Sequence, residues 1–123
     1  SIIKNEDLID VWGDSEQTRS FLYIDDCVEA TLKLFDSNFH GPINIGSEEK
    51  VSINDMIDKI ENISSKKVKK NYQLDKPKGV RGRNSDNTLI RKQLNWEPKF
   101  TLYQGLEKTY NWIYSEIRKK HNQ

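Results

Sequence analysis

The sequence predicts a single small domain of the α/β class, an α+β lobe with short strands and about four helices. Three observations predict this class. Short β-branched and aromatic runs alternate with longer segments whose apolar residues recur every three or four positions. Clusters of turn-forming residues separate these segments. The chain has 123 residues, enough for one hydrophobic core, but too few strands for a complete doubly wound sheet, so we expect a unit that leans on another domain.

The first part of the chain predicts two short strands and a helix. Residues 1–12 end in an apolar pair before the turn-rich "GDSEQ", and residues 18–24, "TRSFLYI", form the stronger strand candidate. Asp25 and Asp26 follow at once and suit a helix N-terminus, where carboxylates accept otherwise unpaired backbone N–H bonds. One face of this helix must pack on another element, and it carries Val28, Leu32 and Phe35.

The middle of the chain predicts a brief strand and the clearest helix. The strand covers residues 43–45, between a Gly-Pro turn and a glycine. The helix follows Ser52, which can cap it, with Asp55 three residues on as an acidic variant of the capping box. Its apolar stripe consists of Ile53, Met56, Ile57, Ile60 and Ile63.

The last part of the chain predicts an edge strand and two helices. Four lysines surround a short strand candidate from Val68 to Tyr72, a composition that favours a solvated edge over a nucleic-acid site because no aromatic ladder accompanies it. A short helix is expected to start near Ser85 or Asp86 and to end before "NWEPKF". The final helix is expected over residues 102–119, with an apolar face of Leu102, Leu106, Tyr110, Ile113 and Ile117.

Composition narrows the compartment and the partners. The formal net charge is +1, from 20 basic and 19 acidic side chains, so nothing in the overall balance favours nucleic acid or a membrane surface. The single cysteine, Cys27, excludes an internal disulfide and agrees with a reducing compartment. No apolar run approaches the roughly 20 residues of a membrane span, and no signal peptide is visible. A cytoplasmic location is therefore expected.

Catalytic machinery is hard to assemble from these residues. The two histidines, His40 and His121, are expected to face solvent, and Cys27 is expected to be a small core residue. The sequence contains neither metal-ligand spacing nor a glycine-rich phosphate loop. We therefore expect no catalytic residue and no metal site in this chain.

Two polar clusters remain as candidates for ligand binding, each just before a predicted element. An arginine presents a planar fork suited to two phosphate oxygens, and a glycine between two arginines lets the backbone approach a ligand closely. From spacing alone, salt bridges with Asp25, Asp26 or Asp86 explain the arginines equally well. The clusters consist of Gln17, Thr18 and Arg19, and of Arg81 and Arg83.

Three quoted stretches carry a resemblance to a known family: "WGDSEQTRSFLYIDDCVEATLKL", "PINIGSEEKVSINDM" and "GVRGRNSDNTLIRKQLNWEPKFTLYQGLEKTYNWI". They resemble the C-terminal, substrate-binding part of extended short-chain dehydrogenase/reductase enzymes, the NAD-dependent epimerase/dehydratase family, which act on nucleotide sugars. Four of the motifs are most similar to those of the epimerases in that family that act on GDP-mannose, namely "QTRSF", "NIGS", "VRGRNSDN" and "TYNWI". The similarity covers nearly the whole chain.

The resemblance implies that substrate binding and catalysis are assigned to different parts of such an enzyme. Residues 1–123 correspond to the C-terminal lobe of a Rossmann-type nucleotide-sugar enzyme, and the NAD-binding Rossmann domain and the catalytic residues belong upstream of residue 1. Gln17, Thr18 and Arg19 match substrate-contacting residues of the family, and Arg83 matches its substrate-binding arginine. Arg81, its neighbour, is a weaker candidate for substrate binding. Alone, this part is expected to be inactive; the full-length enzyme is expected to use NAD and to form a homodimer.

Other interpretations stay open at this stage. The same lobe occurs in other nucleotide-sugar epimerases, dehydratases and decarboxylases of the family. The alternative from a different functional class is a free-standing, non-catalytic module that binds nucleotide sugars or a partner protein. The sequence upstream of Ser1 distinguishes them.

Overall fold

The computed structural model describes residues 2–4 and 6–122, so Ser1, Asn5 and Gln123 lie outside the described residues. The predicted fold class, a small α/β unit with about four helices, is confirmed. In chain order the elements are the 3-10 helix η1 (Ile2–Lys4), β1 (Leu8–Trp12), β2 (Thr18–Arg19), α1 (Ile24–Phe35), β3 (Val51–Ser52), α2 (Ile53–Ser64), β4 (Lys69–Gln73), α3 (Thr88–Leu94) and α4 (Leu102–His121).

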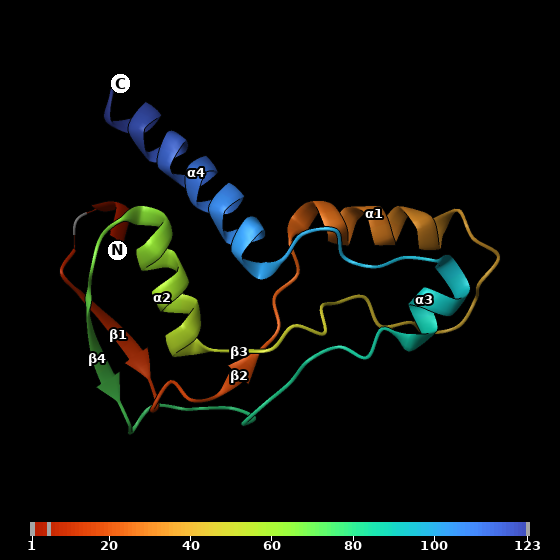
Figure 1. Cartoon of the computed structure of the whole chain (residues 1–123), viewed down its shortest axis with the longest axis horizontal. Coiled ribbons are helices and arrows are strands. Elements are labelled where there is room, and N and C mark those ends of the chain that lie inside the picture. Colours follow the sequence, from red (N-terminus) through yellow and green to blue (C-terminus); the bar gives the residue numbers. More distant parts are fainter. Residues whose placement is uncertain (1, 5, 123) are drawn as a thin grey trace.

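The molecule is elongated, with its helices divided between two ends (Figure 1). β1, β4 and α2 lie at one end, α1 and α3 lie toward the other, and α4 runs from the middle past α2. Two extended segments, residues 42–50 and 79–87, connect the ends and are joined by the bond from Ser85 N to Ser47 O at 3.2 Å. The fold therefore carries long stretches of backbone without regular structure across its middle.

The lysine-rich segment is a strand, as predicted. β4 pairs in parallel with β1, in a register that places Leu8 opposite Lys69 and Trp12 opposite Gln73. A parallel pair needs a crossover connection, and the chain between the two strands includes α1 and α2. Lys70 binds Asp58 of α2 at 2.8 Å, which adds a tie between the strand pair and this helix.

The best-buried apolar side chains lie between α1 and α3. Ala30 and Ile90 are fully buried, and Trp96 is 1% exposed. Partly buried apolar residues surround them, namely Leu22, Ile43, Ile45 and Leu94. The predicted strand over residues 43–45 is wrong: the segment has no strand partner among the described residues, and it contributes its isoleucines to this core.

Helix α1 begins where predicted, but no side chain caps its N-terminus in the described structure. Asp26 is fully buried, yet its carboxylate accepts bonds from the backbone N–H groups of Lys99 and Phe100, at 3.0 and 3.1 Å, and thereby ties α1 to the segment before α4. The face expected to pack is open among the described residues, because Leu32 and Phe35 are 58% and 85% exposed.

At the starts of the other α-helices, nearby side chains bind the backbone N–H groups of the first turn. Ser52 caps α2 by accepting a bond from the Asp55 backbone N–H at 3.0 Å, as predicted, but the Asp55 carboxylate accepts no bond from the Ser52 N–H in the described structure, so the predicted capping box is half formed. Thr101 and Gln104 form a full capping box at the start of α4. α3 begins only at Thr88, later than predicted, because the carboxylate of Asp86 binds the Thr88 backbone and hydroxyl from outside the helix.

No helix in the described part of the chain combines the length and the apolar character needed to cross a membrane.

Candidate functional site

The candidate site is built around β2, where three backbone segments meet. On one side β2 pairs antiparallel with β3, and on the other it contacts the segment with the two arginines. The Thr18 N–H donates to Arg81 O at 2.9 Å, and the Arg83 N–H donates to Thr18 O at 3.3 Å. The strand predicted over residues 18–24 is therefore reduced to two residues, but it brings the two predicted clusters together.

Gly82 makes this close approach possible. It forms an isolated parallel bridge with Thr18, and a Cβ built on Gly82 would lie only 2.7 Å from Thr18 Oγ1. Gly79, three residues earlier, has a φ of +67° in the left-handed region that favours glycine. The glycines of "GVRGR" therefore turn the chain and then let it lie against β2.

The three arginines of the clusters have different surroundings. Arg19 is half-buried and donates to two carbonyls, Thr18 O at 2.7 Å and Lys78 O at 3.4 Å. Arg81 pairs with Asp14 at 3.3 Å. Arg83 is exposed, and its side chain has no hydrogen bond or ion pair within residues 2–4 and 6–122.

The salt-bridge interpretation therefore holds for Arg81 alone, and with a carboxylate other than those expected. The pKa of Asp14 is lowered, first by the bond it accepts from the Glu16 backbone N–H and then by Arg81. Asp25 and Asp86 form no ion pair with these arginines among the described residues. Arg19 and Arg83 are left as cations without a carboxylate partner in the described structure, which is the electrostatic condition for binding an anion.

Gln17 is fixed next to these groups. Its amide Nε2 donates to Trp12 O at 3.1 Å, and its backbone carbonyl accepts from the Ile53 N–H at 3.3 Å. Its Oε1 is buried and has no donor in the described part of the molecule. A buried acceptor without a donor costs about 1–3 kcal/mol, so a ligand hydroxyl or a water would stabilise it.

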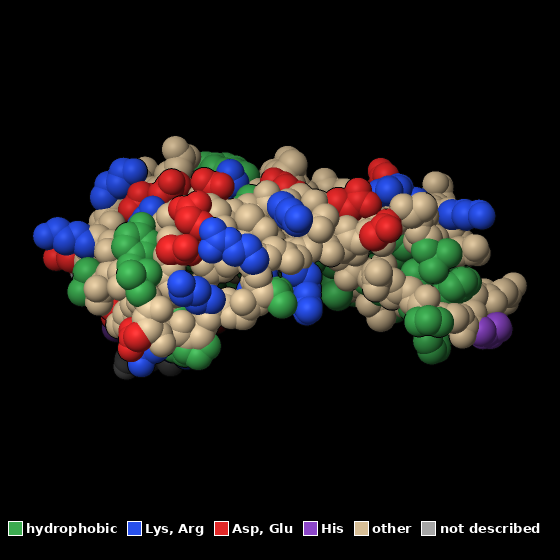
Figure 2. All heavy atoms as spheres, turned by 90° about the horizontal axis from the view of Figure 1, so that it is seen from below, with side chains coloured by type: hydrophobic (Ala, Val, Ile, Leu, Met, Phe, Trp, Pro, Cys, Tyr) green, Lys and Arg blue, Asp and Glu red, His purple; other side chains and the backbone are tan. Residues whose placement is uncertain are grey.

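Sequence reasoning missed two further lysines, one of which lies beside the bridge. The Lys50 ammonium lies 3.9 Å from the position a Gly82 Cβ would take, and Lys78 packs along Gly13. The signal for Lys50 was its place directly before β3, the strand that pairs with β2. On the face seen in Figure 2, Lys and Arg side chains alternate with acidic ones and form no continuous basic stripe of the kind that would suit a nucleic acid.

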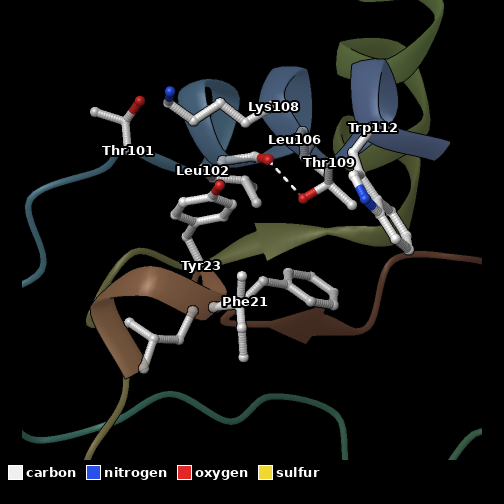
Figure 3. Close-up of a pocket in the computed structure, with 11 residues that line it drawn as sticks. Phe21, Tyr23, Thr101, Leu102, Leu106, Lys108, Thr109 and Trp112 are labelled. Atoms are coloured by element: carbon white, nitrogen blue, oxygen red, sulfur yellow. Dashed lines mark hydrogen bonds between the residues drawn. The ribbon is translucent and has the colours of Figure 1, made fainter. Parts of the chain in front are cut away.

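A separate apolar pocket of about 580 Å³ lies between the segment before α1 and the first half of α4. Figure 3 shows Tyr23 and Phe21 on one side of it and α4 with Trp112 and Thr109 on the other. A Cβ at Gly105 would lie 3.1 Å from Tyr23 Cβ, so the glycine permits this close approach. Burial, and then Asp25, raises the pKa of the Tyr23 hydroxyl.

This pocket contains none of the predicted ligand residues. It offers one ammonium, that of Lys108, which lies 5.4 Å from the centre of the Phe100 ring. It is therefore suited to packing against another apolar surface.

The other predicted side chains show no reactive arrangement in the described structure. His40 and His121 are exposed, as expected, and Cys27 is half-buried. No group of His, Cys, Asp and Glu able to hold a metal ion occurs among the described residues.

Comparisons with known proteins agree on one family. Residues 2–109 match the family model described as GDP-mannose 4,6 dehydratase. The chain is 47% identical over 114 residues to GDP-mannose 3,5-epimerase of Arabidopsis thaliana, covering 93% of this chain and 30% of that protein. It is 34% identical to UDP-glucuronate 4-epimerase of Thermodesulfobacterium geofontis, covering 94% and 36%.

Solved structures give the same result. UDP-glucose 4-epimerase of Thermotoga maritima, solved with UDP-glucose, matches with a TM-score of 0.88 and 26% identity, over 94% of this chain and 37% of that one. UDP-glucuronic acid 4-epimerase of Bacillus cereus, solved with UDP-glucuronic acid and NAD, matches with a TM-score of 0.78 and 32% identity, over 88% and 35%. The chain therefore spans about a third of the length of the relatives it matches.

Proposed function

We propose that this chain, which belongs to the GDP-mannose 4,6 dehydratase family within the NAD-dependent epimerases and dehydratases, is the substrate-binding domain of a nucleotide-sugar epimerase. GDP-mannose is the proposed substrate, because the 47% identity to a GDP-mannose 3,5-epimerase exceeds the identity to the UDP-sugar enzymes described above. The proposed reaction of the whole enzyme is inversion at the sugar carbons named in that relative.

The contact between β2 and the arginine segment, residues 79–87, carries this proposal. It brings Gln17, Thr18 and Arg19 beside Arg83, whose guanidinium has no carboxylate partner among the described residues. A nucleotide diphosphate carries its negative charge away from the sugar carbons that react, so binding energy gained there can position the sugar. Arg83 is the proposed diphosphate clamp, and Arg81, held by Asp14, has an auxiliary role.

NAD is proposed as the cofactor of the whole enzyme, in which it supplies transient oxidation of the sugar. We propose that its phosphate-binding loop lies outside residues 1–123, because this sequence has no glycine-rich dinucleotide loop. We therefore assign NAD to an N-terminal Rossmann domain and assign no catalytic residue to residues 1–123. Without that domain, the chain is expected to be inactive.

The exposed apolar surfaces support an absent domain of this kind. The outer face of α1, with Leu32 and Phe35, and the pocket beside Trp112 are both open to solvent. About two thirds of the length of the relatives has no counterpart here, which is ample for a domain that covers these surfaces. We propose the Rossmann domain as their occupant, and a cytoplasmic homodimer as the state of the full-length enzyme.

Titration calorimetry with GDP-mannose tests the proposed site. Arg83→Ala should weaken binding about tenfold or more, the loss of a charge-assisted hydrogen bond. Arg118→Ala, on α4 and away from β2, is the matched control and should bind as the unchanged chain does. Equal heats for Arg83→Ala and the unchanged chain would remove Arg83 from the site.

The same titration separates the alternatives. Binding of UDP-glucuronate in preference to GDP-mannose would assign the chain to another nucleotide-sugar enzyme of the family. A reading frame with no Rossmann domain upstream of Ser1 would favour a free-standing binding module.

A further inference from the structure

The arginine segment lacks regular structure but is anchored at both ends. Its upstream anchor is the pair of backbone bonds between Thr18 and residues 81 and 83. Its downstream anchor is a cluster that joins residues 84–87 to residues 46–49 of the other extended segment. Arg83 is the last residue of the upstream anchor, directly before the downstream anchor, and belongs to no helix or strand.

Asn87 is the centre of the downstream anchor. It is 1% exposed although its side chain is polar. Its Nδ2 donates to Gly46 O at 2.9 Å, and its Oδ1 accepts from the Ser85 hydroxyl at 2.6 Å. Ser85 packs so closely on Gly46 that a Cβ at Gly46 would lie 2.7 Å from the Ser85 Cβ. The side-chain amide of Asn87 thus bonds both to Gly46 and to Ser85 of the arginine segment.

Glu48 completes the anchor from the other side. Its Oε1 accepts from the Asn87 backbone N–H at 2.9 Å and from the Arg91 guanidinium at 3.0 Å. Its backbone carbonyl accepts from Asn84 Nδ2 at 3.4 Å. Glu48 is therefore bonded to residues on both sides of Asp86, and Arg91 neutralises its charge.

We propose that Asn87 and Glu48 are positioning residues that hold Arg83 in the geometry required for the diphosphate. The inference rests on the proposed function, since it assigns a purpose to groups that do not touch the ligand. An irregular segment loses about 1–2 kcal/mol of conformational entropy per residue when it is ordered. If the segment is already ordered in the free protein, binding does not incur that cost, and the protein binds the diphosphate more tightly.

Hydrogen exchange and GDP titration on Asn87→Ala test the proposal together. The Arg83 N–H, which is bonded to Thr18 O, should exchange about tenfold faster or more, because loss of the amide frees the segment. GDP should bind about fivefold to tenfold more weakly, the loss expected for one hydrogen-bonded anchor. Ser85→Ala, which keeps the Cβ and removes only the bond to Asn87, should show both effects in smaller measure and serves if Asn87→Ala does not fold.

Asp26→Ala is the matched control. It also removes a buried polar side chain with two bonds to distant residues, but these lie at the segment before α4. It should lower the melting temperature while GDP affinity and Arg83 exchange stay unchanged. Glu48→Gln, which retains an acceptor for the Asn87 N–H, should keep most of the affinity that Glu48→Ala loses.

Unchanged Arg83 exchange in Asn87→Ala would overturn the inference, as would equal acceleration in Asp26→Ala. Absence of GDP binding by the unchanged chain would contradict the proposed function instead, and the exchange experiment would still decide whether Asn87 orders the segment.

Discussion

Replacing Gly82 with alanine tests the contact on which the candidate site depends. Gly82 bridges Thr18, and an added Cβ would lie 2.7 Å from Thr18 Oγ1, closer than such atoms approach in proteins. Gly82 is not among the residues with a positive φ, so alanine introduces a steric conflict and no backbone strain. The variant should move the arginine segment away from β2 without unfolding the rest of the chain.

The size of the effect follows from the bonds at the bridge. Two backbone bonds, of 2.9 and 3.3 Å, join Thr18 to the arginine segment. At about 0.5–1.5 kcal/mol each, their loss would lower the free energy of unfolding by about 1–3 kcal/mol. GDP affinity should fall about tenfold or more, because Arg83 loses its place beside Arg19.

A second substitution distinguishes this steric cause from a general loss of stability. Because the conflict is with the Thr18 hydroxyl, Thr18→Ala in the Gly82→Ala background should restore stability and the Arg83 N–H protection. Chemical denaturation measures the free energy of unfolding, hydrogen exchange measures the protection of the Arg83 N–H, and calorimetry measures the GDP affinity. Wild-type stability in Gly82→Ala, or no recovery in the double variant, would refute the reasoning.

Three further predictions concern the core, the pH dependence and the exposed helix. Ile90→Ala should lower the free energy of unfolding by about 2–5 kcal/mol in denaturant titration, because Ile90 is fully buried; a loss below 1 kcal/mol would contradict its place in the core. The pKa of Glu61 is lowered from 4.5, first by the Val68 N–H and then by Lys67, so its contribution to stability is present above pH 4.5 and is lost as the pH falls below it. The melting temperature of Glu61→Gln should therefore fall less than that of the unchanged chain as the pH is lowered below 4.5. Equal falls in melting temperature for the two proteins would count against this contribution of Glu61. The exposed apolar face of α1 is expected to favour self-association of this chain. Substituting Phe35, which is 85% exposed on α1, with Gln should therefore reduce self-association in light scattering with little change in melting temperature. A large destabilisation would show that this face is packed within the chain.

Much of the helical structure could be predicted because its signals are local. Ser52 caps α2 as its spacing to Asp55 indicates, and helix α4, Leu102–His121, covers nearly the predicted range. The family could be recognised for a related reason, since its motifs are short runs of adjacent residues. The errors lie where a segment depends on a distant partner. Residues 43–45 have strand composition, but a strand also needs a neighbour, and none lies beside them in the described structure.

The sequence by itself determined the class of the fold, the family and the two clusters that contain the candidate arginines. Only the tertiary structure decided that Thr18 contacts Gly82, that Arg81 pairs with Asp14 while Arg83 keeps its charge unpaired among the described residues, and that Asp26 binds the segment before α4. The physical reason is the range of the interactions. Helix periodicity and capping act within a few residues, whereas these contacts join positions 64 to 73 residues apart and depend on how the whole chain packs.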